Sequence, residues 1–453
     1  MLNFLKRVLS ETDINDALEA ARTAAKSGNE EEALKGLAPV IDIQPKQRTA
    51  AVALLKFVDE GRLSAENTLA ILNDIENAFS KDIEIISKLG HALEEACEIN
   101  FLNRPAPDHP LFQRVIETLS KAARDARYSD NESAVLQGLA TAARMAGRKA
   151  DNAAESAYKS MIELDPNNSG RHYGYGLFLK TRGRFREGAE QNRIAIKLAG
   201  KSADAVEWNL GICATGAGDG QTALDLWKRK GNKLELGRFD LPEGRYPQCK
   251  VRLAERPLAE RSAENDDPGF EETVWVERLS PCHGIIRSVL YQNLGVNYGD
   301  VVLFDGAPVT YHKYGDKDVA VFPHLATLKR LNYQFFDFAG TQSREFEIME
   351  KSAALPSDAV IYSHSEQYQT LCATCWKNPD IDHQNHQTTE KHVVVGKIAA
   401  PPDIDAANLL ESLDGALTET DDCSIYTPSL CEEAGEKQRA ILEQRRFNML
   451  MNN

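Results

Sequence analysis

The sequence contains no uninterrupted apolar run of the roughly 18 residues that a membrane-spanning helix needs. Its first residues also lack the order of a secretory signal, because Lys6 and Arg7 follow the first apolar residues and no longer apolar run comes after them. We therefore predict a soluble, cytoplasmic chain without a membrane span. At roughly 100–200 residues per domain, a length of 453 residues leaves room for two to four domains.

Positive charge is in deficit: the chain has 53 Lys and Arg against 68 Asp and Glu, a formal net charge of −15. Such a chain repels phosphate backbones on average, so we expect no nucleic-acid partner. The short basic group Arg182, Arg184 and Arg186 is interpreted as the solvated edge of a loop. Because 42% of the residues are hydrophobic, the chain can bury a core, and wholesale disorder is excluded.

Cysteine is sparse as well. Eight cysteines over this length are too few for a disulfide framework, which favours a reducing compartment. Most of them stand alone, and only Cys372 and Cys375 form a close pair.

Aromatic and β-branched residues are scarce in residues 1–235, where Ala, Leu, Glu, Lys and Arg dominate. These are strong helix formers. Apolar residues recur there at steps of three and four, as in Leu136, Leu139, Ala140 and Ala143. The composition and the period together predict one helix after another.

Glycines in this half recur at a fixed interval. Gly176 and Gly211 lie 35 residues apart, and so do Gly183 and Gly218. A small residue inside each helix lets two backbones approach closely, and a glycine between the helices permits a tight turn. Each helix pair leaves an apolar face uncovered, so the pairs must stack on one another.

This pattern resembles the tetratricopeptide repeat family, whose unit is an antiparallel helix pair of about 34 residues. The match is good for 169–203 and 204–230 and fair for 135–168 and 14–47, while 48–130 reads as helices without a clean repeat. The resemblance implies a curved solenoid with a concave groove that binds a protein or peptide. From the repeat register we expect these residues at the groove: Tyr173, Leu177, Lys180, Trp208, Asn209 and Ile212.

Some members of that family hold a peptide carboxylate with Lys, Arg and Asn at such positions. Here the positions are mainly apolar, with Asn209 as a lone amide, which favours an apolar or helical partner segment. A simpler interpretation also stays open, in which the apolar residues only pack between neighbouring repeats. Trp208 fits both interpretations.

The composition changes after residue 235. Residues 236–272 are rich in Gly, Pro and charge and predict a linker or long loop. Residues 273–400 carry short β-branched and aromatic runs separated by turns such as Asp305-Gly306, which predict a β-rich barrel or sandwich. Residues 401–453 predict a helical tail. The expected fold class is therefore α+β and multidomain.

One cluster in the β-rich part has the content of a metal site: Cys372, Cys375, His383 and His386. Two Cys and two His can hold a tetrahedral zinc ion, although these spacings are tighter than usual. We consider structural zinc, a polar loop with unpaired thiols and a redox dithiol as alternatives. Cys282 and His283 are adjacent, but catalytic Cys and His pairs meet in space rather than in sequence.

The sequence therefore favours an interaction scaffold or adaptor that binds a protein or peptide in the repeat groove. No catalytic residue is assigned and no cofactor other than zinc. One alternative is a zinc-dependent hydrolase in 273–400 that uses the repeats to recruit substrate, and another is a regulator that responds to a peptide.

Overall fold

A computed structural model describes residues 8–98, 109–125, 130–200, 203–356, 358–372, 388–418 and 423–451. By its internal contacts the chain divides into two compact units. The first contains Met1–Glu243, Arg256–Pro268 and Asp305–Ala326, and the second contains Gly244–Glu255, Gly269–Phe304 and Thr327–Asn453.

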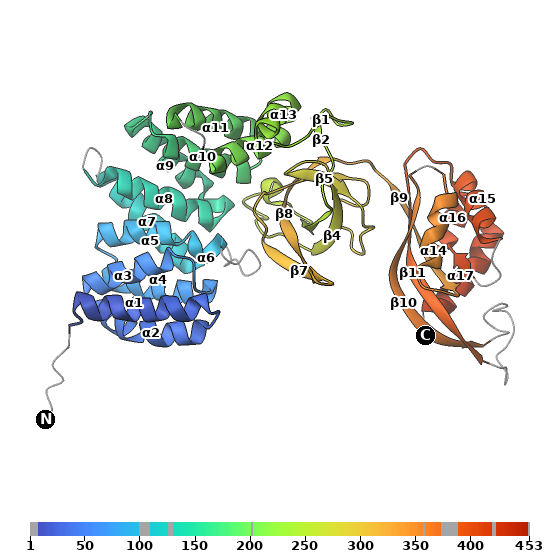
Figure 1. Cartoon of the computed structure of the whole chain (residues 1–453), viewed down its shortest axis with the longest axis horizontal. Coiled ribbons are helices and arrows are strands. Elements are labelled where there is room, and N and C mark those ends of the chain that lie inside the picture. The colour runs from blue at the N-terminus through green and yellow to red at the C-terminus, as the bar shows by residue number, and fades with distance from the viewer. Residues whose placement is uncertain are drawn as a thin grey trace. The chain divides into compact units, whose positions relative to one another are not determined.

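Helices follow one another through the first 243 residues and stack in sequence order (Figure 1). Their bounds are α1 Glu11–Lys26, α2 Glu30–Ile43, α3 Arg48–Val58, α4 Ala65–Phe79, α5 Ile83–Ala92, α6 Glu95–Glu98, α7 Pro110–Asp125, α8 Glu132–Ala146, α9 Asp151–Leu164, α10 Ser169–Thr181, α11 Phe185–Ala199, α12 Asp204–Gly216 and α13 Gly220–Arg229. Buried side chains of α1 to α10 form a continuous core from Ile14 to Leu179.

The last two helix pairs confirm the 35-residue interval. α10 and α12 begin at Ser169 and Asp204 and end at Thr181 and Gly216, so the second helix repeats the first after 35 residues. The glycine between the two helices of each pair has a left-handed backbone, with φ 72° at Gly183 and 74° at Gly218. Residues with a Cβ rarely adopt this conformation, which is why the turn repeats with the glycine.

The small residue inside α12 is required by packing. A Cβ on Gly211 would lie 2.2 Å from the Cζ2 atom of Trp227 on α13. Trp227 is fully buried, so its ring has no room to move away. The glycine at the repeat position therefore sets the distance between the two helices of this pair.

The β-rich part contains a barrel. Its strands are β3 Cys249–Ala254, β4 Glu271–Arg278, β5 His283–Ile286, β6 Val301–Phe304, β7 Thr310–Tyr314 and β8 Lys317–Lys329. The strand order is β3-β4-β5-β6-β8-β7, and an additional pairing of β3 with β8 closes the sheet. β5 and β6 are buried along their whole length, as strands inside a small barrel should be.

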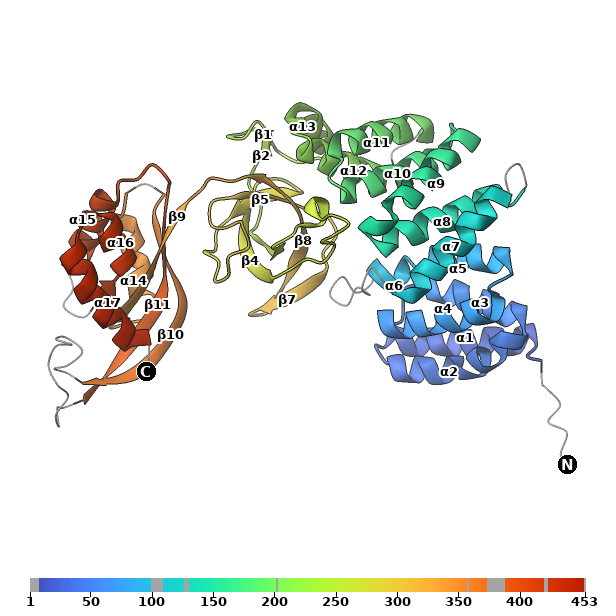
Figure 2. The same ribbon diagram turned by 180° about the vertical axis from the view of Figure 1, so that it is seen from behind.

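A separate sheet follows in the order β10-β11-β9-β12. Its strands are β9 Gln334–Gln342, β10 Val360–Cys372, β11 Thr388–Ala400 and β12 Ser424–Tyr426. Four helices lie on one face of this sheet (Figure 2): α14 Glu347–Glu350, α15 Ala406–Leu417, α16 Pro428–Glu433 and α17 Lys437–Met451. Phe338 and Ile398 of the sheet share a buried cluster with Leu413 of α15 and Leu430 of α16.

Two segments differ from their sequence interpretation. The predicted helical tail shares its core with β9–β11, and Ile348 of α14 joins the same buried cluster. The predicted linker 236–272 contains β3, which pairs with β4, and short strands β1 Glu235–Leu236 and β2 Pro242–Glu243 lie at its start. Charge and proline concealed the alternating buried pattern of β3. The domain boundaries stay predictions.

Among the described residues, we find no helix with the length and apolar character needed to cross a bilayer.

Candidate binding groove

The expected groove residues lie on two consecutive first helices of the repeat. Tyr173, Leu177 and Lys180 are on α10, with spacings of four and three that place them on one helix face. Trp208 and Ile212 occupy the equivalent positions on α12, 35 residues after Tyr173 and Leu177. Asn209 lies beside them.

The structure brings these side chains together around one cavity of about 750 Å³ within the first unit. Its other walls come from the helices before α10 and from two segments later in the chain. The lining residues contributed from outside α10 and α12 are Glu94, Cys97, Arg144, Met145, Arg182, Leu258, Asp305, Gly306, Ala307, Pro308, Val309 and Pro323.

The groove residues divide by exposure. Tyr173, Leu177 and Trp208 are partly exposed, whereas Lys180, Asn209 and Ile212 are buried. The Trp208 ring meets that of Trp227 edge to face at 4.9 Å between centroids. Trp208 therefore packs between helices and also lines the cavity, so both interpretations open in the sequence apply to it.

Lys180 is buried with a counter-ion from a distant part of the chain. Its Nζ donates a hydrogen bond to Asp305 Oδ2 at 2.7 Å. Burial opposes the charged form, but the charge and hydrogen bond of Asp305 more than offset it, and the pKa of Lys180 lies above its usual value. Lys180 is thus a cation at neutral pH.

The other cations at the cavity also have acidic partners in the same unit. Arg144 forms an ion pair with Glu94. Arg182 forms one with Asp151 at 2.7 Å and also donates to the backbone oxygen of Arg144 at 2.9 Å. The cavity is therefore lined by paired charges rather than by an excess of positive charge.

Asn209 adds an unused acceptor. Its Nδ2 donates to Asn192 Oδ1 on α11 at 3.2 Å. Its Oδ1 is buried and has no hydrogen-bond partner among the described residues. A buried acceptor without a donor is costly.

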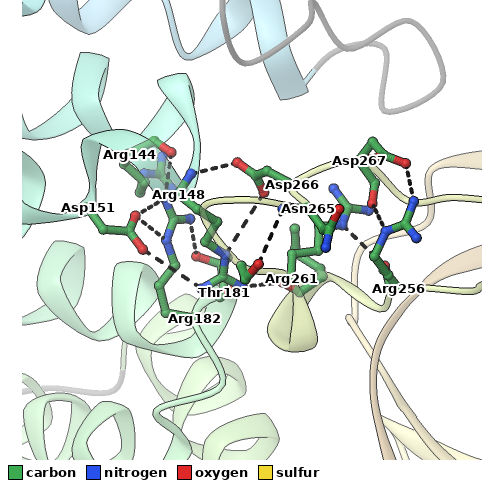
Figure 3. Close-up of polar contacts among 12 residues, drawn as sticks. Arg144, Arg148, Asp151, Thr181, Arg182, Arg256, Arg261, Asn265, Asp266 and Asp267 are labelled. Carbon is green, nitrogen blue, oxygen red and sulfur yellow. Dashed lines mark hydrogen bonds and ion pairs between the residues drawn. The ribbon is translucent and has the colours of Figure 1, made fainter.

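A strap formed by residues 256–268 lies against the helices beside the cavity (Figure 3). The side chain of Arg148 donates to the backbone oxygens of Leu258 at 2.5 Å and Thr181 at 3.0 Å. The backbone N–H of Arg148 donates to Asp266 Oδ2 at 2.6 Å. These contacts fix Leu258, one of the cavity-lining residues, relative to α10.

The predicted zinc ligands are not brought together by the described residues. Cys372 is the last residue of β10, and Cys375, His383 and His386 lie outside the described part of the chain. Within that part, no group of three or more His, Cys, Asp or Glu side chains is arranged to hold a metal ion. The zinc site stays a prediction.

Cys282 and His283 lie in the barrel and are fully buried. The His283 Nδ1 atom forms a hydrogen bond with the Ser280 hydroxyl at 2.5 Å, and burial lowers the pKa of His283 to about 3. At neutral pH His283 is therefore an uncharged side chain in the barrel core.

The part of the cavity wall that later segments supply was not predicted from the sequence. Asp305-Gly306 is visible as a turn, and the structure uses it as one, with the Gly306 N–H donating to Asp305 Oδ1 at 2.7 Å. Nothing in the turn signal indicates a contact with a helix 125 residues earlier. A lysine on an otherwise apolar helix face was the available signal, because a buried lysine needs an acidic partner.

No family model and no curated protein matches this sequence. Solved structures similar to it include PilW, a widely conserved type IV pilus biogenesis factor, at 11% identity and a TM-score of 0.34 over 49% of this chain and 93% of that one. PilF of Pseudomonas aeruginosa has 16% identity and a TM-score of 0.30, covering 48% and 90%. The TPR2AB domain of yeast Sti1, in complex with pHSP90, has 15% identity and a TM-score of 0.19 over 48% of this chain and 90% of that one.

The assignment of the fold rests on the chain's own helix pairs. α10 to α13 repeat after 35 residues, with left-handed turn glycines and close helix contacts at the small residues. The helical part of this chain therefore has a tetratricopeptide-like repeat fold, and the predicted resemblance is confirmed at that level.

Proposed function

We propose that the chain is an interaction scaffold whose repeats bind an uncharged, apolar segment of a protein or peptide in the cavity next to Trp208. The observation that carries the proposal is the convergence of partly exposed apolar side chains from consecutive repeats, Tyr173, Leu177 and Trp208, on one cavity. Its volume of about 750 Å³ suits a few side chains of a bound segment.

The polar groups of the cavity support an uncharged ligand. Lys180 and Arg144 have acidic partners already, so a carboxylate on the ligand would compete with Asp305 or Glu94. The Asn209 Oδ1 atom offers an acceptor to a backbone N–H of the segment. Apolar side chains would supply the affinity and this amide the orientation.

Photo-crosslinking tests the proposal. Tyr173 is replaced by p-benzoylphenylalanine in the full chain, and cells of the native host are irradiated. We expect a crosslinked partner peptide. The matched control carries the same residue at Tyr291, which is 75% exposed in the barrel part of the chain. A crosslink from Tyr173 that is absent at Tyr291 supports the groove, and the same products at both positions contradict it.

A pair of leucine substitutions gives a second measurement. Leu177→Arg puts a charge into the cavity and should abolish the Tyr173 crosslink, because an unpaired cation would have to be desolvated there. Leu164→Arg makes the same change at an exposed position, 44% accessible at the end of α9, and should leave the crosslink intact. If Leu177→Arg leaves the crosslink unchanged, the bound segment does not enter this cavity.

A further inference from the structure

We infer that Asp305 determines which charge the groove accepts, by occupying in cis the place that a ligand carboxylate would take on Lys180. The inference rests on the proposed function, because it concerns the specificity of the same cavity. With Asp305 present the groove selects uncharged segments, and without it the groove selects carboxylates.

The two opposite charges lie side by side in the cavity wall. Lys180 and Asp305 both line the cavity, and their side chains are 7% and 23% exposed. The acid is therefore the more solvent-accessible member of the pair. A ligand carboxylate approaching Lys180 would meet Asp305 at short range, where like charges repel strongly in a partly desolvated site.

Asp305 is held in place by hydrogen bonds. Its backbone N–H donates to the Pro323 oxygen at 3.2 Å, and the Val309 N–H donates to the Val321 oxygen at 2.8 Å. Both bonds fix the 305–309 turn to the strand β8. One carboxylate oxygen accepts from Lys180 and the other from the Gly306 N–H, so each oxygen is held by a hydrogen bond within the first unit.

The 305–309 turn packs closely against α12. A Cβ on Gly306 would lie 3.0 Å from Cε3 of Trp208, so the turn touches the ring through its backbone. The turn that carries the acid thus belongs to the wall of the cavity. Displacing the turn would separate its backbone from the aromatic side chain that the ligand itself uses.

The test compares two probes of similar shape, the anion 4-fluorophenylacetate and the neutral 4-fluorophenylacetamide, by ¹⁹F NMR titration of the full chain. The wild type should bind the amide at least as tightly as the acid. Asp305→Asn keeps the size of the side chain and removes its charge. This variant should bind the acid at least ~10-fold more tightly than the wild type does, which corresponds to about 1.4 kcal/mol.

Two further variants make the outcome specific. Asp305→Asn combined with Lys180→Met should lose the gain, because the cation that attracts the acid is gone. Asp305→Ser replaces Asp305→Asn if the latter fails to fold by circular dichroism. If the Asp305→Asn chain binds 4-fluorophenylacetate no more tightly than the wild type, or not at all, the inference is wrong. It is also wrong if the tighter binding persists after Lys180→Met is added.

The outcomes separate this inference from the proposed function. If the Tyr173 crosslink is absent but Asp305→Asn binds 4-fluorophenylacetate more tightly, the specificity role of Asp305 holds and the scaffold proposal fails. If the crosslink forms and depends on Leu177 but Asp305→Asn binds 4-fluorophenylacetate no more tightly than the wild type, the scaffold proposal holds and the role of Asp305 fails.

Discussion

Individual buried ionisable residues in this chain are compensated in different ways. Lys180 keeps its charge because Asp305 is 2.7 Å away. His283 is equally buried, but its recorded contact is the neutral Ser280 hydroxyl, and its Nε2 atom has no hydrogen-bond partner among the described residues. The imidazole therefore stays neutral, since protonation would place an uncompensated charge inside the barrel.

The low pKa of His283 predicts a loss of stability in acid. Its pKa is about 3 in the folded chain against 6.5 for the free side chain, so the unfolded state binds the proton first as the pH falls. This contribution to the free energy of unfolding is complete above about pH 6.5 and decreases by up to about 1.4 kcal/mol per pH unit towards pH 3. Urea unfolding between pH 7 and 4 measures the slope.

The control for this slope is a pair of substitutions. His283→Leu should make the curve shallower in this window, whatever its effect at pH 7. His312→Leu, at a partly exposed position on β7, is the control for removing a histidine from the chain. Equal slopes for the wild type and His283→Leu would mean that His283 titrates normally.

At the scale of the elements, two helices can approach closely only where their contact residue is small. Gly211→Ala should destabilise the chain by about 1–3 kcal/mol, because the new Cβ overlaps the buried Trp227 ring. Gly415→Ala is the matched control, since nothing lies within 4 Å of a Cβ at this position of α15. There alanine should be neutral or stabilise by up to about 1 kcal/mol. Thermal unfolding of both variants compares them.

A buried guanidinium contacts the strap 256–268. Arg148, with a side chain 8% exposed, donates to backbone oxygens of both the strap and α10. Arg148→Met leaves these acceptors without their donor and should cost about 2–5 kcal/mol. Faster hydrogen exchange in residues 256–268 should accompany the loss.

An exposed arginine provides the comparison for Arg148. Arg193 pairs with Asp219, and both side chains are 41% exposed. Arg193→Met should cost less than about 1 kcal/mol, because solvent already screens this pair. If the two substitutions cost the same, the contacts of Arg148 with the strap contribute little.

These elements also show what the sequence can reveal. The helices and their interval were predictable because their signals are local: Gly183 and Gly218 mark turns, and Gly176 and Gly211 mark close contacts. The part of the groove on α10 and α12 followed from the same interval. β3 was not predicted because charged residues and prolines surround it. Its alternation of buried and partly exposed residues becomes recognisable only once it is paired with β4.

At the scale of the whole molecule, the first unit is built from three segments that are separate in sequence. Its helices come from the first 243 residues, while the strap and the 305–326 segment return to it later. A single sequence carries no information about which distant residues meet, so the pairing of Lys180 with Asp305 could not be predicted. This arrangement makes the environment of a helix residue depend on a segment far along the chain.

That dependence predicts a substitution whose effect changes sign with the length of the chain. In the full chain, Lys180→Met leaves Asp305 without its counter-ion and should lower the free energy of unfolding by about 2–4 kcal/mol. In a chain that ends at Glu243, Asp305 is absent and Lys180 is the unpaired charge. Methionine should then be neutral or stabilising, because it buries an apolar side chain in place of a cation.

Urea unfolding of four proteins, each chain length with and without Lys180→Met, measures this coupling as a double-mutant cycle. Thr215→Val is the control, because Thr215 occupies the position 35 residues after Lys180 and donates within its own helix to the Gly211 oxygen at 2.8 Å. Its effect should be the same in both chains. An equal loss from Lys180→Met in both chains would show that Lys180 stabilises the helices by itself and that the returning turn contributes nothing through it.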